Sequence, residues 1–220
     1  MSQYLITGAT RGIGRALVDL LSPSESLIAL GRTSDSLAGL AVDRRIVADL
    51  AYPEELADRL PGFDSLDGLV HCAGVLDYAP VSRAEVGLWR RSLDVNVVSA
   101  AELTRLLLPA LRASGGTVVF VNSGQGLSAA PNLATYAAAK HALRAVAESL
   151  RAEEPGIRVC SIYLGRTATD MQRELRDAEQ GSYDQDRYLS PATVAQAIAD
   201  VLRLPADAVI TDLTLRPQRP

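Results

Sequence analysis

Short apolar runs alternate with longer helical patterns along the whole chain, and this alternation constrains the fold more than any other feature. Short runs rich in Val, Ile and Leu are typical of buried strands, whereas longer segments with apolar side chains at helical spacing are typical of helices. Strands are expected at Gln3–Thr7, Ser26–Leu30, Arg45–Ala48, Leu69–Cys72, Thr117–Val121, Ile157–Leu164 and Ala208–Leu213. Helices are expected at Gly12–Leu21, Pro53–Leu60, Ala84–Leu111, Ala134–Ala152, Thr169–Glu179 and Pro191–Leu202. This order predicts an α/β fold, a single-domain Rossmann-type doubly wound parallel sheet of about seven strands over residues 1–220, with helices on both faces.

The composition agrees with a globular domain and excludes several classes of function. Hydrophobic residues make up 48% of the 220 residues, too large a share for a disordered chain. With 22 basic and 26 acidic residues the net charge is −4, so we expect no nucleic-acid partner. Cys72 and Cys160 lie in apolar runs, which indicates small buried residues in a reduced compartment. The two histidines are widely spaced from them, so no metal site is expected.

The amino terminus, Met1–Tyr4, has no basic segment followed by an apolar one. No part of the sequence approaches the roughly 18 consecutive apolar residues that a membrane helix needs. We therefore expect a cytoplasmic protein that does not enter a membrane.

A glycine-rich turn follows the first expected strand and leads directly into the first helix. Its sequence is Thr7-Gly8-Ala9-Thr10-Arg11-Gly12-Ile13-Gly14. Glycine permits a tight turn and a close approach of the backbone to a ligand, and the helix amino terminus offers free N–H groups to a pyrophosphate. We interpret Gly8, Thr10, Arg11, Gly12, Ile13 and Gly14 as residues that bind a dinucleotide. The alternative is a glycine-rich turn without a ligand.

The second expected strand ends at Gly31-Arg32-Thr33, where a dinucleotide fold places the residue that meets the adenosine ribose. An acid at this point favours NAD, because it binds the 2′-hydroxyl. Arg32 instead favours the 2′-phosphate of NADP(H), and Arg11 in the turn could flank the same group. The alternative is that both arginines are solvated surface residues.

Lys140 is the only lysine among the 22 basic residues, and it lies four residues after Tyr136 in the alanine-rich helix. This spacing brings both side chains to one helix face. A free tyrosine has a pKa near 10, and a cation about 4 Å away lowers it by as much as about 3 units. The pair therefore predicts an acid–base tyrosine supported by an ammonium group. The alternative is an ordinary pair on a helix surface.

Ser123 follows the buried strand Thr117–Val121 and precedes Tyr136 by 13 residues. Ligands of a parallel sheet meet the carboxyl ends of its strands, so Ser123 is expected to face the same crevice as the glycine-rich turn. The alternative is a serine that only forms a turn.

Taken together, these residues resemble the classical short-chain dehydrogenase/reductase (SDR) family over essentially the whole chain. The turn Thr7–Gly14, Ser123 and the Tyr136-x-x-x-Lys140 pair match the family motifs in order and spacing. The resemblance also matches Asn96 to the catalytic asparagine. It implies cofactor contacts from Asp49 and Leu50 after the third strand, Ala73 and Gly74 after the fourth, and Thr169 after the sixth.

The resemblance implies hydride transfer between NADP(H) and a small carbonyl or alcohol substrate. Tyr136 is then the general acid or base, Ser123 orients and polarises the carbonyl, and Lys140 lowers the tyrosine pKa and binds the nicotinamide ribose. Asn96 helps to hold a water that leads to Lys140, or has only a structural role in its helix. Tyr136 and Lys140 thus serve both catalysis and cofactor binding.

Three segments depart from the family pattern. His71-Cys72 replaces two asparagines before Ala73-Gly74, and Cys72 is expected to pack rather than to carry redox chemistry. Leu164-Gly165 replaces Pro-Gly, and Thr211–Pro217 replaces the usual glycine-rich end of the chain. In many relatives that end packs across a subunit interface, so a tetramer is in doubt here, whereas a homodimer through the long helices remains plausible.

The alternative functions are a non-catalytic NADP-binding sensor and a nucleotide-sugar epimerase or dehydratase. A non-catalytic NADP-binding sensor usually loses the tyrosine or the lysine, and a nucleotide-sugar epimerase or dehydratase needs a substrate domain for which 220 residues leave no room. The sequence does not name the substrate. The polar stretch 180–190 is a candidate lid, Tyr183 and Tyr188 could cover an apolar substrate or merely pack, and Arg166 or Arg173 could meet an anion.

Overall fold

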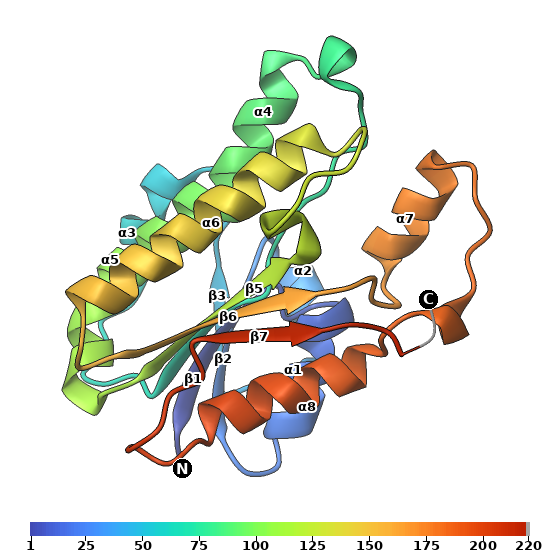
Figure 1. Cartoon of the computed structure of the whole chain (residues 1–220). Helices are drawn as coiled ribbons and strands as arrows, with labels where there is room; N and C mark the ends of the chain where they lie inside the picture. The colour runs from blue at the N-terminus through green and yellow to red at the C-terminus, as the bar shows by residue number, and fades with distance from the viewer. Residues whose placement is uncertain (219–220) are drawn as a thin grey trace.

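The computed structural model describes residues 1–218 and contains one parallel sheet of seven strands (Figure 1). The strands are β1 (Gln3–Thr7), β2 (Ser26–Gly31), β3 (Arg44–Val47), β4 (Gly68–His71), β5 (Thr117–Ser123), β6 (Arg158–Leu164) and β7 (Asp212–Leu215). Their order across the sheet is β3-β2-β1-β4-β5-β6-β7, and every neighbouring pair is parallel. The predicted Rossmann-type doubly wound sheet is confirmed.

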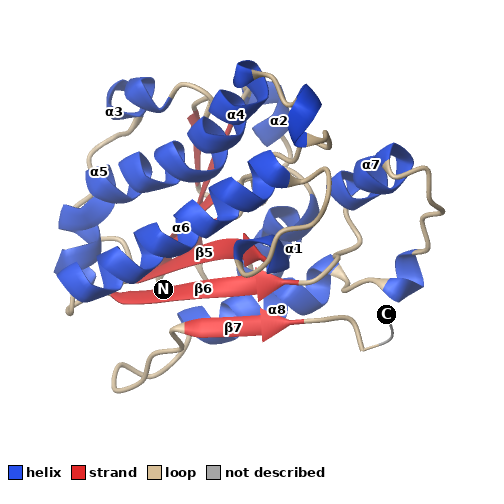
Figure 2. Ribbon diagram, turned by 45° about the horizontal axis from the view of Figure 1, so that its top comes forward, coloured by secondary structure: helices blue, strands red, loops and turns tan. Residues whose placement is uncertain are grey.

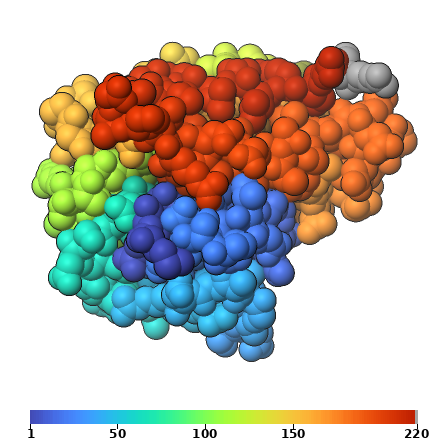
Figure 3. Space-filling view, turned by 90° about the horizontal axis from the view of Figure 1, so that it is seen from below, coloured from blue at the N-terminus to red at the C-terminus, as the bar shows by residue number. Residues whose placement is uncertain are grey.

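Helices cover both faces of this sheet (Figure 2). They are α1 (Gly12–Leu21), α2 (Ser34–Leu37), α3 (Leu56–Arg59), α4 (Val86–Leu93), α5 (Ser99–Ser114), α6 (Ala134–Glu153), α7 (Asp170–Ala178) and α8 (Pro191–Leu202). Successive side chains of a strand point to opposite faces of the sheet, so each strand contributes residues to the hydrophobic cores on both faces. Ile6 and Ala29 pack with α1 and α8, which lie side by side in Figure 3. Leu5 and Ile28 pack on the other side with α5 and α6.

The position of β1 between β2 and β4 determines where a ligand can bind. The chain runs from β1 to β2 and β3 on one side, and then returns to β4 and the later strands on the other side. The crossovers on the two sides diverge and leave a crevice at the carboxyl ends of the strands. The glycine-rich turn follows β1 and therefore lies at this crevice.

The long helix predicted over Ala84–Leu111 is divided. α4 and α5 are joined by a π-helical turn at Asp94–Val98, where one extra residue interrupts the regular hydrogen-bond pattern. α5 then continues to Ser114 and ends at Gly115, which has the left-handed φ of 63° that favours glycine. Sequence periodicity cannot distinguish a single π-turn from a continuous helix, because both keep the apolar side chains on nearly one face.

The last strand lies four residues later than its predicted start and ends two residues later. The apolar run Ala208–Ile210 suggested a strand, but β7 pairs with β6 only from Asp212, which lies opposite Ser161. This edge strand is set by its register with β6, and Val209 in the apolar run is half exposed. The prediction Ala208–Leu213 is therefore corrected to Asp212–Leu215.

The segment after α7, predicted as a candidate lid, is held by backbone hydrogen bonds at Leu189 in this structure. The backbone of Leu189 accepts from Ala168 N–H at 2.8 Å and donates to the Arg166 carbonyl at 3.0 Å. Tyr183 and Tyr188 pack against each other with their ring centroids 5.4 Å apart. Its movement over the crevice stays a prediction.

Candidate active site

A cavity of about 820 Å³ opens at the carboxyl ends of the strands. Its lining includes every site residue predicted from the sequence except Asn96. Those residues are Gly8, Thr10, Arg11, Gly12, Ile13, Gly14, Arg32, Thr33, Asp49, Leu50, Ala73, Gly74, Ser123, Tyr136, Lys140 and Thr169. The fold thus brings side chains from distant parts of the sequence to one concave site of the size that small-molecule ligands occupy.

The turn between β1 and α1 has the geometry that a phosphate group requires. Gly8 and Gly12 have φ angles of 65° and 55°, in the left-handed region that disfavours a side chain. A Cβ on Gly8 would lie 2.7 Å from the Ala73 nitrogen, and a Cβ on Gly14 would overlap the Gly8 carbonyl oxygen. The first turn of α1 has no acidic residue, and the Arg11 side chain does not cap the helix. The backbone N–H groups of this first turn therefore remain available to a pyrophosphate.

The carboxyl ends of β2 and β3 form one wall of the cavity. Arg32 is exposed there and forms no ion pair within the described residues 1–218. Thr33 accepts a hydrogen bond from Ser36 N–H at 3.2 Å and thereby caps α2. Asp49 accepts from Ala51 N–H at 3.0 Å, which holds its carboxylate after β3. This wall therefore presents a cation and a fixed acid to the cavity.

Arg11 points towards α7 rather than lying alone at the turn. Its guanidinium is 4.0 Å from Asp170 and 3.8 Å from Glu174, and all three side chains are mostly exposed. Beside it, a Cβ on Gly12 would lie 3.2 Å from the Thr169 methyl group. The glycine-rich turn and the start of α7 therefore face each other, although about 160 positions separate them in the sequence.

Ser123 and Tyr136 meet at the end of β5. The Ser123 hydroxyl accepts a hydrogen bond from Gln125 N–H at 3.1 Å, which fixes it at the strand end. Tyr136 comes from the first turn of α6 and is almost fully buried. Burial raises the pKa of Tyr136 to about 12, while interaction with the Ser123 side chain lowers it to a smaller extent.

Lys140 lies one helical turn beyond Tyr136 and is only 4% exposed. Its ammonium donates to the Val121 carbonyl at 2.9 Å and lies 5.6 Å from the centre of the Tyr136 ring. Burial lowers the pKa of Lys140 to about 8, because the charged form loses its hydration. The sequence predicted that Lys140 lowers the Tyr136 pKa. In this structure burial outweighs any such effect.

Asn96 does not line the large cavity. It is 2% exposed within the π-turn, and its amide nitrogen donates to the carbonyls of Val75, at 3.0 Å, and Ser92, at 2.9 Å. Its amide oxygen accepts from Val75 N–H at 3.1 Å. Asn96 also borders a second cavity of about 10 Å³, which is near the lower limit for one water molecule. Its side chain therefore holds the segment after β4, and a water path to Lys140 stays a prediction.

Thr169 begins α7 and sits at the cavity. Its hydroxyl accepts from Gln172 N–H at 3.3 Å and donates to the Thr167 carbonyl at 3.3 Å. The Gln172 side chain is 7% exposed, and its amide nitrogen has no hydrogen-bond partner within the described residues. A buried donor without a partner is uncommon in native proteins, so this amide fits a site that a ligand completes.

Comparison with known proteins identifies the family of this chain. Residues 3–180 match the family model for short chain dehydrogenases. The chain belongs to the short-chain dehydrogenase family. It is 30% identical to an uncharacterized short-chain type dehydrogenase/reductase of Sinorhizobium fredii, over 99% of this chain and 93% of that protein. It is also 30% identical to the glycine betaine reductase ATRR of Emericella nidulans, over 97% of this chain but only 18% of that reductase.

A solved structure gives the same result for the fold of this short-chain dehydrogenase. A serine dehydrogenase, in its closed form with NADP+, superposes with a TM-score of 0.83 at 25% identity. The match covers 97% of this chain and 94% of that one. The family assignment supports oxidoreductase activity with a nicotinamide cofactor and a small-molecule substrate.

His71 and Cys72, which depart from the family pattern, are packing residues in this short-chain dehydrogenase. His71 is buried, its Nε2 lies 2.9 Å from the Thr104 hydroxyl, and its ring stacks on Phe120 at 4.9 Å. Burial lowers the pKa of His71 to about 3, so the ring is neutral at pH 7. Burial also raises the pKa of Cys72 to about 12, which leaves a thiol without nucleophilic character.

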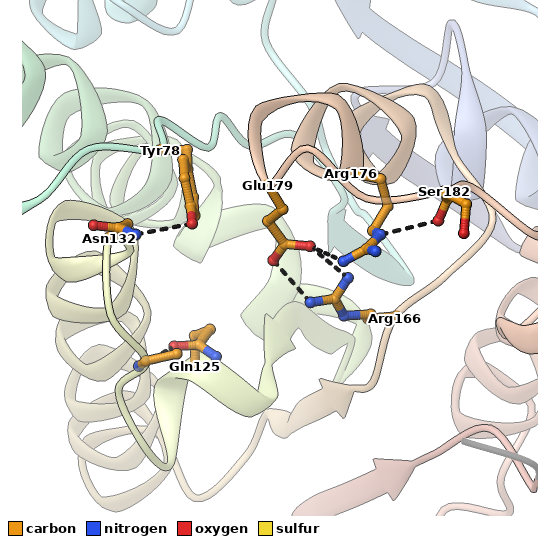
Figure 4. Close-up of polar contacts among 8 residues, drawn as sticks. Tyr78, Gln125, Asn132, Arg166, Arg176, Glu179 and Ser182 are labelled. Atoms are coloured by element: carbon orange, nitrogen blue, oxygen red, sulfur yellow. Dashed lines mark hydrogen bonds and ion pairs between the residues drawn. The ribbon is translucent and has the colours of Figure 1, made fainter.

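One end of the cavity, which we call the Tyr78 end, lies among polar side chains, of which the sequence suggested only Arg166 (Figure 4). Tyr78 and Asn132 form a hydrogen bond of 2.8 Å on one side. On the other side Arg166 forms two hydrogen bonds of 2.8 and 3.0 Å with Glu179, which also pairs with Arg176. The charge of Arg166, a candidate for binding an anion, is thus shared with an acid.

Arg173 is the other arginine proposed from the sequence to meet an anion. Its guanidinium lies 4.3 Å from the centre of the Tyr183 ring, and neither residue lines the cavity. Tyr188 packs against Tyr183, whose ring lies against Arg173 of α7. The sequence contained no local signal for the other residues of the Tyr78 end, because their loops meet only in the folded chain.

Among the described residues, His, Cys, Asp and Glu side chains form no group of three that could hold a metal ion. Within residues 1–218, no helix has both the length and the hydropathy needed to span a membrane.

Proposed function

We propose that this short-chain dehydrogenase transfers hydride between NADP(H) and a carbonyl or alcohol substrate. The observation that carries the proposal is the convergence of Ser123, Tyr136 and Lys140 at the end of β5. These three side chains line the same cavity as the glycine-rich turn, so a cofactor and a substrate could meet in front of them. NADP(H) supplies the hydride or accepts it.

Tyr136 is proposed as the residue that gives or takes the proton. A carbonyl oxygen placed between the Ser123 and Tyr136 hydroxyls receives two hydrogen bonds, which polarise the carbonyl and stabilise the charge that develops on its oxygen. The raised pKa keeps Tyr136 protonated at neutral pH, as a proton donor in carbonyl reduction must be. In the reverse direction the same group accepts the proton of the alcohol.

Lys140 is proposed to support this proton transfer. Its ammonium is fixed by the Val121 carbonyl and lies beside Tyr136, so it favours the phenolate that remains after the proton has left. A buried ammonium has three donors, and the two that Val121 does not use can bind ribose hydroxyl groups. Arginine could not provide the same compact charge at this point.

Arg32 supports NADP(H) rather than NAD(H). It stands after β2, where a dinucleotide fold places the residue that meets the adenosine ribose, and it forms no ion pair within residues 1–218. Asp49 follows the next strand and is proposed to contact the adenine.

A fluorescence titration of the purified protein with NADPH and with NADH tests the cofactor assignment first. We expect NADPH to bind about 10- to 100-fold more tightly, since Arg32 can form charge-assisted hydrogen bonds with the 2′-phosphate. A panel of ketones, aldehydes and quinones then tests oxidation of NADPH. Tight binding of NADPH with no turnover of any carbonyl would contradict the catalytic proposal and favour a sensor, and binding of neither nucleotide would contradict both assignments.

A further inference from the structure

The carboxyl end of β7 lies directly beside the catalytic strand end. In the register of the sheet Ser123 lies opposite Leu164, and Leu164 lies opposite Leu215. Each of these three residues is the last of its strand, and the residues that follow them in the chain are Gly124, Gly165 and Arg216. The segment Thr211–Pro217, which departs from the family pattern, therefore places Arg216 at the carboxyl ends of the strands, where Ser123 also lies.

Arg216 reaches across this edge towards Ser123. A Cβ on Gly124 would lie 2.5 Å from the Arg216 Nη1 atom, so the guanidinium rests against the Gly124 backbone. The neighbouring Gly165 gives room to the stem, since a Cβ there would lie 3.3 Å from the Arg216 Cδ. The guanidinium lines the large cavity one residue beyond Ser123.

The positive charge of Arg216 is not neutralised within the part of the chain that the structure describes. It forms no ion pair and no hydrogen bond with residues 1–218. Arg91 and Arg166, which also line the cavity, are paired with Asp77 at 2.6 Å and with Glu179. Arg216 in contrast remains available to pair with a ligand beside Gly124.

The acceptors around Arg216 are already occupied. The Gln125 side-chain oxygen accepts from Ala130 N–H at 3.0 Å, which leaves its amide N–H groups as donors. Glu179 is held by two arginines. The remaining acids that line the cavity, Asp49 and Asp170, belong to the cofactor wall and the start of α7. This end of the cavity thus offers donors and one cation, which suits a ligand with a carboxylate.

We propose that Arg216 binds a carboxylate of the substrate, so that the enzyme acts on short oxo acids or on the corresponding hydroxy acids. This inference rests on the proposed function, because Ser123 and Tyr136 must hold the reacting carbonyl. In the sheet register Arg216 lies one residue beyond the position opposite Ser123, so we take the carboxylate to be attached to the carbonyl carbon or separated from it by a single carbon. Planar guanidinium and carboxylate groups form two parallel hydrogen bonds.

The reaction is balanced without a further reagent. NADPH gives one hydride to the carbonyl carbon, Tyr136 gives one proton to the carbonyl oxygen, and the products are a hydroxy acid and NADP+. The carboxylate remains unchanged and serves only as the point of attachment. Arg216 is therefore a specificity-determining residue that contacts the substrate.

Pairs of acids and esters test this assignment. The probes are 2-oxobutanoate with its methyl ester and acetoacetate with its methyl ester, each assayed for NADPH oxidation by the full chain. We expect kcat/KM to be higher for one of the acids than for its ester. In Arg216→Gln, kcat/KM for that acid should fall by about 10- to 100-fold, mainly through KM, because hydrogen bonds to a charged group are lost. The ester should change by less than about twofold.

Two further variants complete the experiment. Arg216→Lys keeps the charge but loses the two parallel hydrogen bonds, so its kcat/KM for the acid should lie between the wild type and Arg216→Gln. Arg90→Gln removes an exposed arginine of α4 outside the cavity and should leave both substrates unchanged. The affinity of each variant for NADPH is measured by fluorescence and should equal that of the wild type.

The outcomes separate the two proposals. If neutral ketones are reduced but acids are not preferred, or Arg216→Gln leaves the acid unaffected, the role of Arg216 is wrong and the proposed function stands. A loss of NADPH affinity in Arg216→Gln would also overturn it, because the arginine would then bind the cofactor. Failure of every carbonyl together with failure to bind NADPH would contradict the proposed function itself.

Discussion

The ammonium of Lys140 donates a hydrogen bond to the backbone carbonyl of Val121 at 2.9 Å. Val121 lies in β5 two residues before Ser123, so this bond ties α6 to the strand that carries the proposed catalytic serine. The bond fixes the distance between the lysine and the Tyr136 ring at 5.6 Å. It also explains how a buried cation is tolerated, since a charge–dipole bond replaces part of its lost hydration.

The buried position of Lys140 should be visible in its titration. Since it is the only lysine, a sample labelled with [ε-¹³C]lysine gives one NMR signal, and we expect its midpoint near pH 8 in the native protein. The folded pKa lies below the ordinary value of 10.5, so the unfolded chain binds more protons between these pH values. The contribution of Lys140 to stability should therefore rise with pH in that window, whereas Cys72, with its raised pKa, contributes in the opposite sense above about pH 9. A native midpoint above pH 10 would contradict the burial assigned to this side chain.

Tyr136→Phe should lower turnover by about 10²- to 10⁴-fold, because the proposed proton donor is lost. The affinity for NADPH should change little, since the aromatic ring that lines the cavity remains. Tyr52→Phe removes a hydroxyl from an exposed tyrosine and serves as the control. Steady-state rates and nucleotide fluorescence measure the two properties, and retention of wild-type turnover in Tyr136→Phe would exclude Tyr136 as the donor.

Arg32→Asp should reverse the preference for nucleotides. The substitution removes the cation proposed to meet the 2′-phosphate and introduces an acid that can accept hydrogen bonds from a 2′-hydroxyl. We expect the ratio of the NADPH to the NADH dissociation constants to rise by about 10- to 100-fold. Arg90→Asp, on exposed α4, is a control with the same change in charge. An unchanged ratio would mean that another residue selects the cofactor.

Gly14→Ala should damage both stability and nucleotide binding. The new Cβ would overlap the Gly8 carbonyl oxygen, which belongs to the backbone and cannot move without opening the turn. We expect a loss of at least about 2 kcal/mol in the free energy of unfolding, together with weaker NADPH binding. Gly62→Ala is the matched control, because a Cβ there meets no atom within 4 Å. Denaturant titration and fluorescence provide the two measurements.

Asn96→Ala tests whether Asn96 acts mainly on structure. Its amide makes three hydrogen bonds to the backbone of Val75 and Ser92, and removal leaves buried groups without partners. We expect a loss of about 2–4 kcal/mol in the free energy of unfolding. Gln196→Ala removes an exposed amide on α8 and should change this value by less than about 0.5 kcal/mol. Wild-type stability with a large loss of turnover would instead favour the predicted role in proton supply.

Much of the fold could be predicted because its signals are local. The apolar runs of β1 and β5 and the patterns of α1 and α8 matched the structure closely, since a buried parallel sheet requires continuous apolar strands. The π-turn at Asp94–Val98 and the true start of β7 could not be predicted. One depends on a single inserted residue, and the other on register with a neighbouring strand.

In the candidate site, too, some features follow from local sequence and others only from the folded chain. The sequence by itself determined the glycine-rich turn and the Tyr136–Lys140 pair, because both depend on short spacings that a strand end or one helix face fixes. Only the tertiary structure decided that burial raises the pKa of Tyr136 and that Asn96 binds the Val75 backbone. It alone decided that Arg216 lies against Gly124, the residue after Ser123, because that contact depends on the register of three strands whose residues are far apart in the chain.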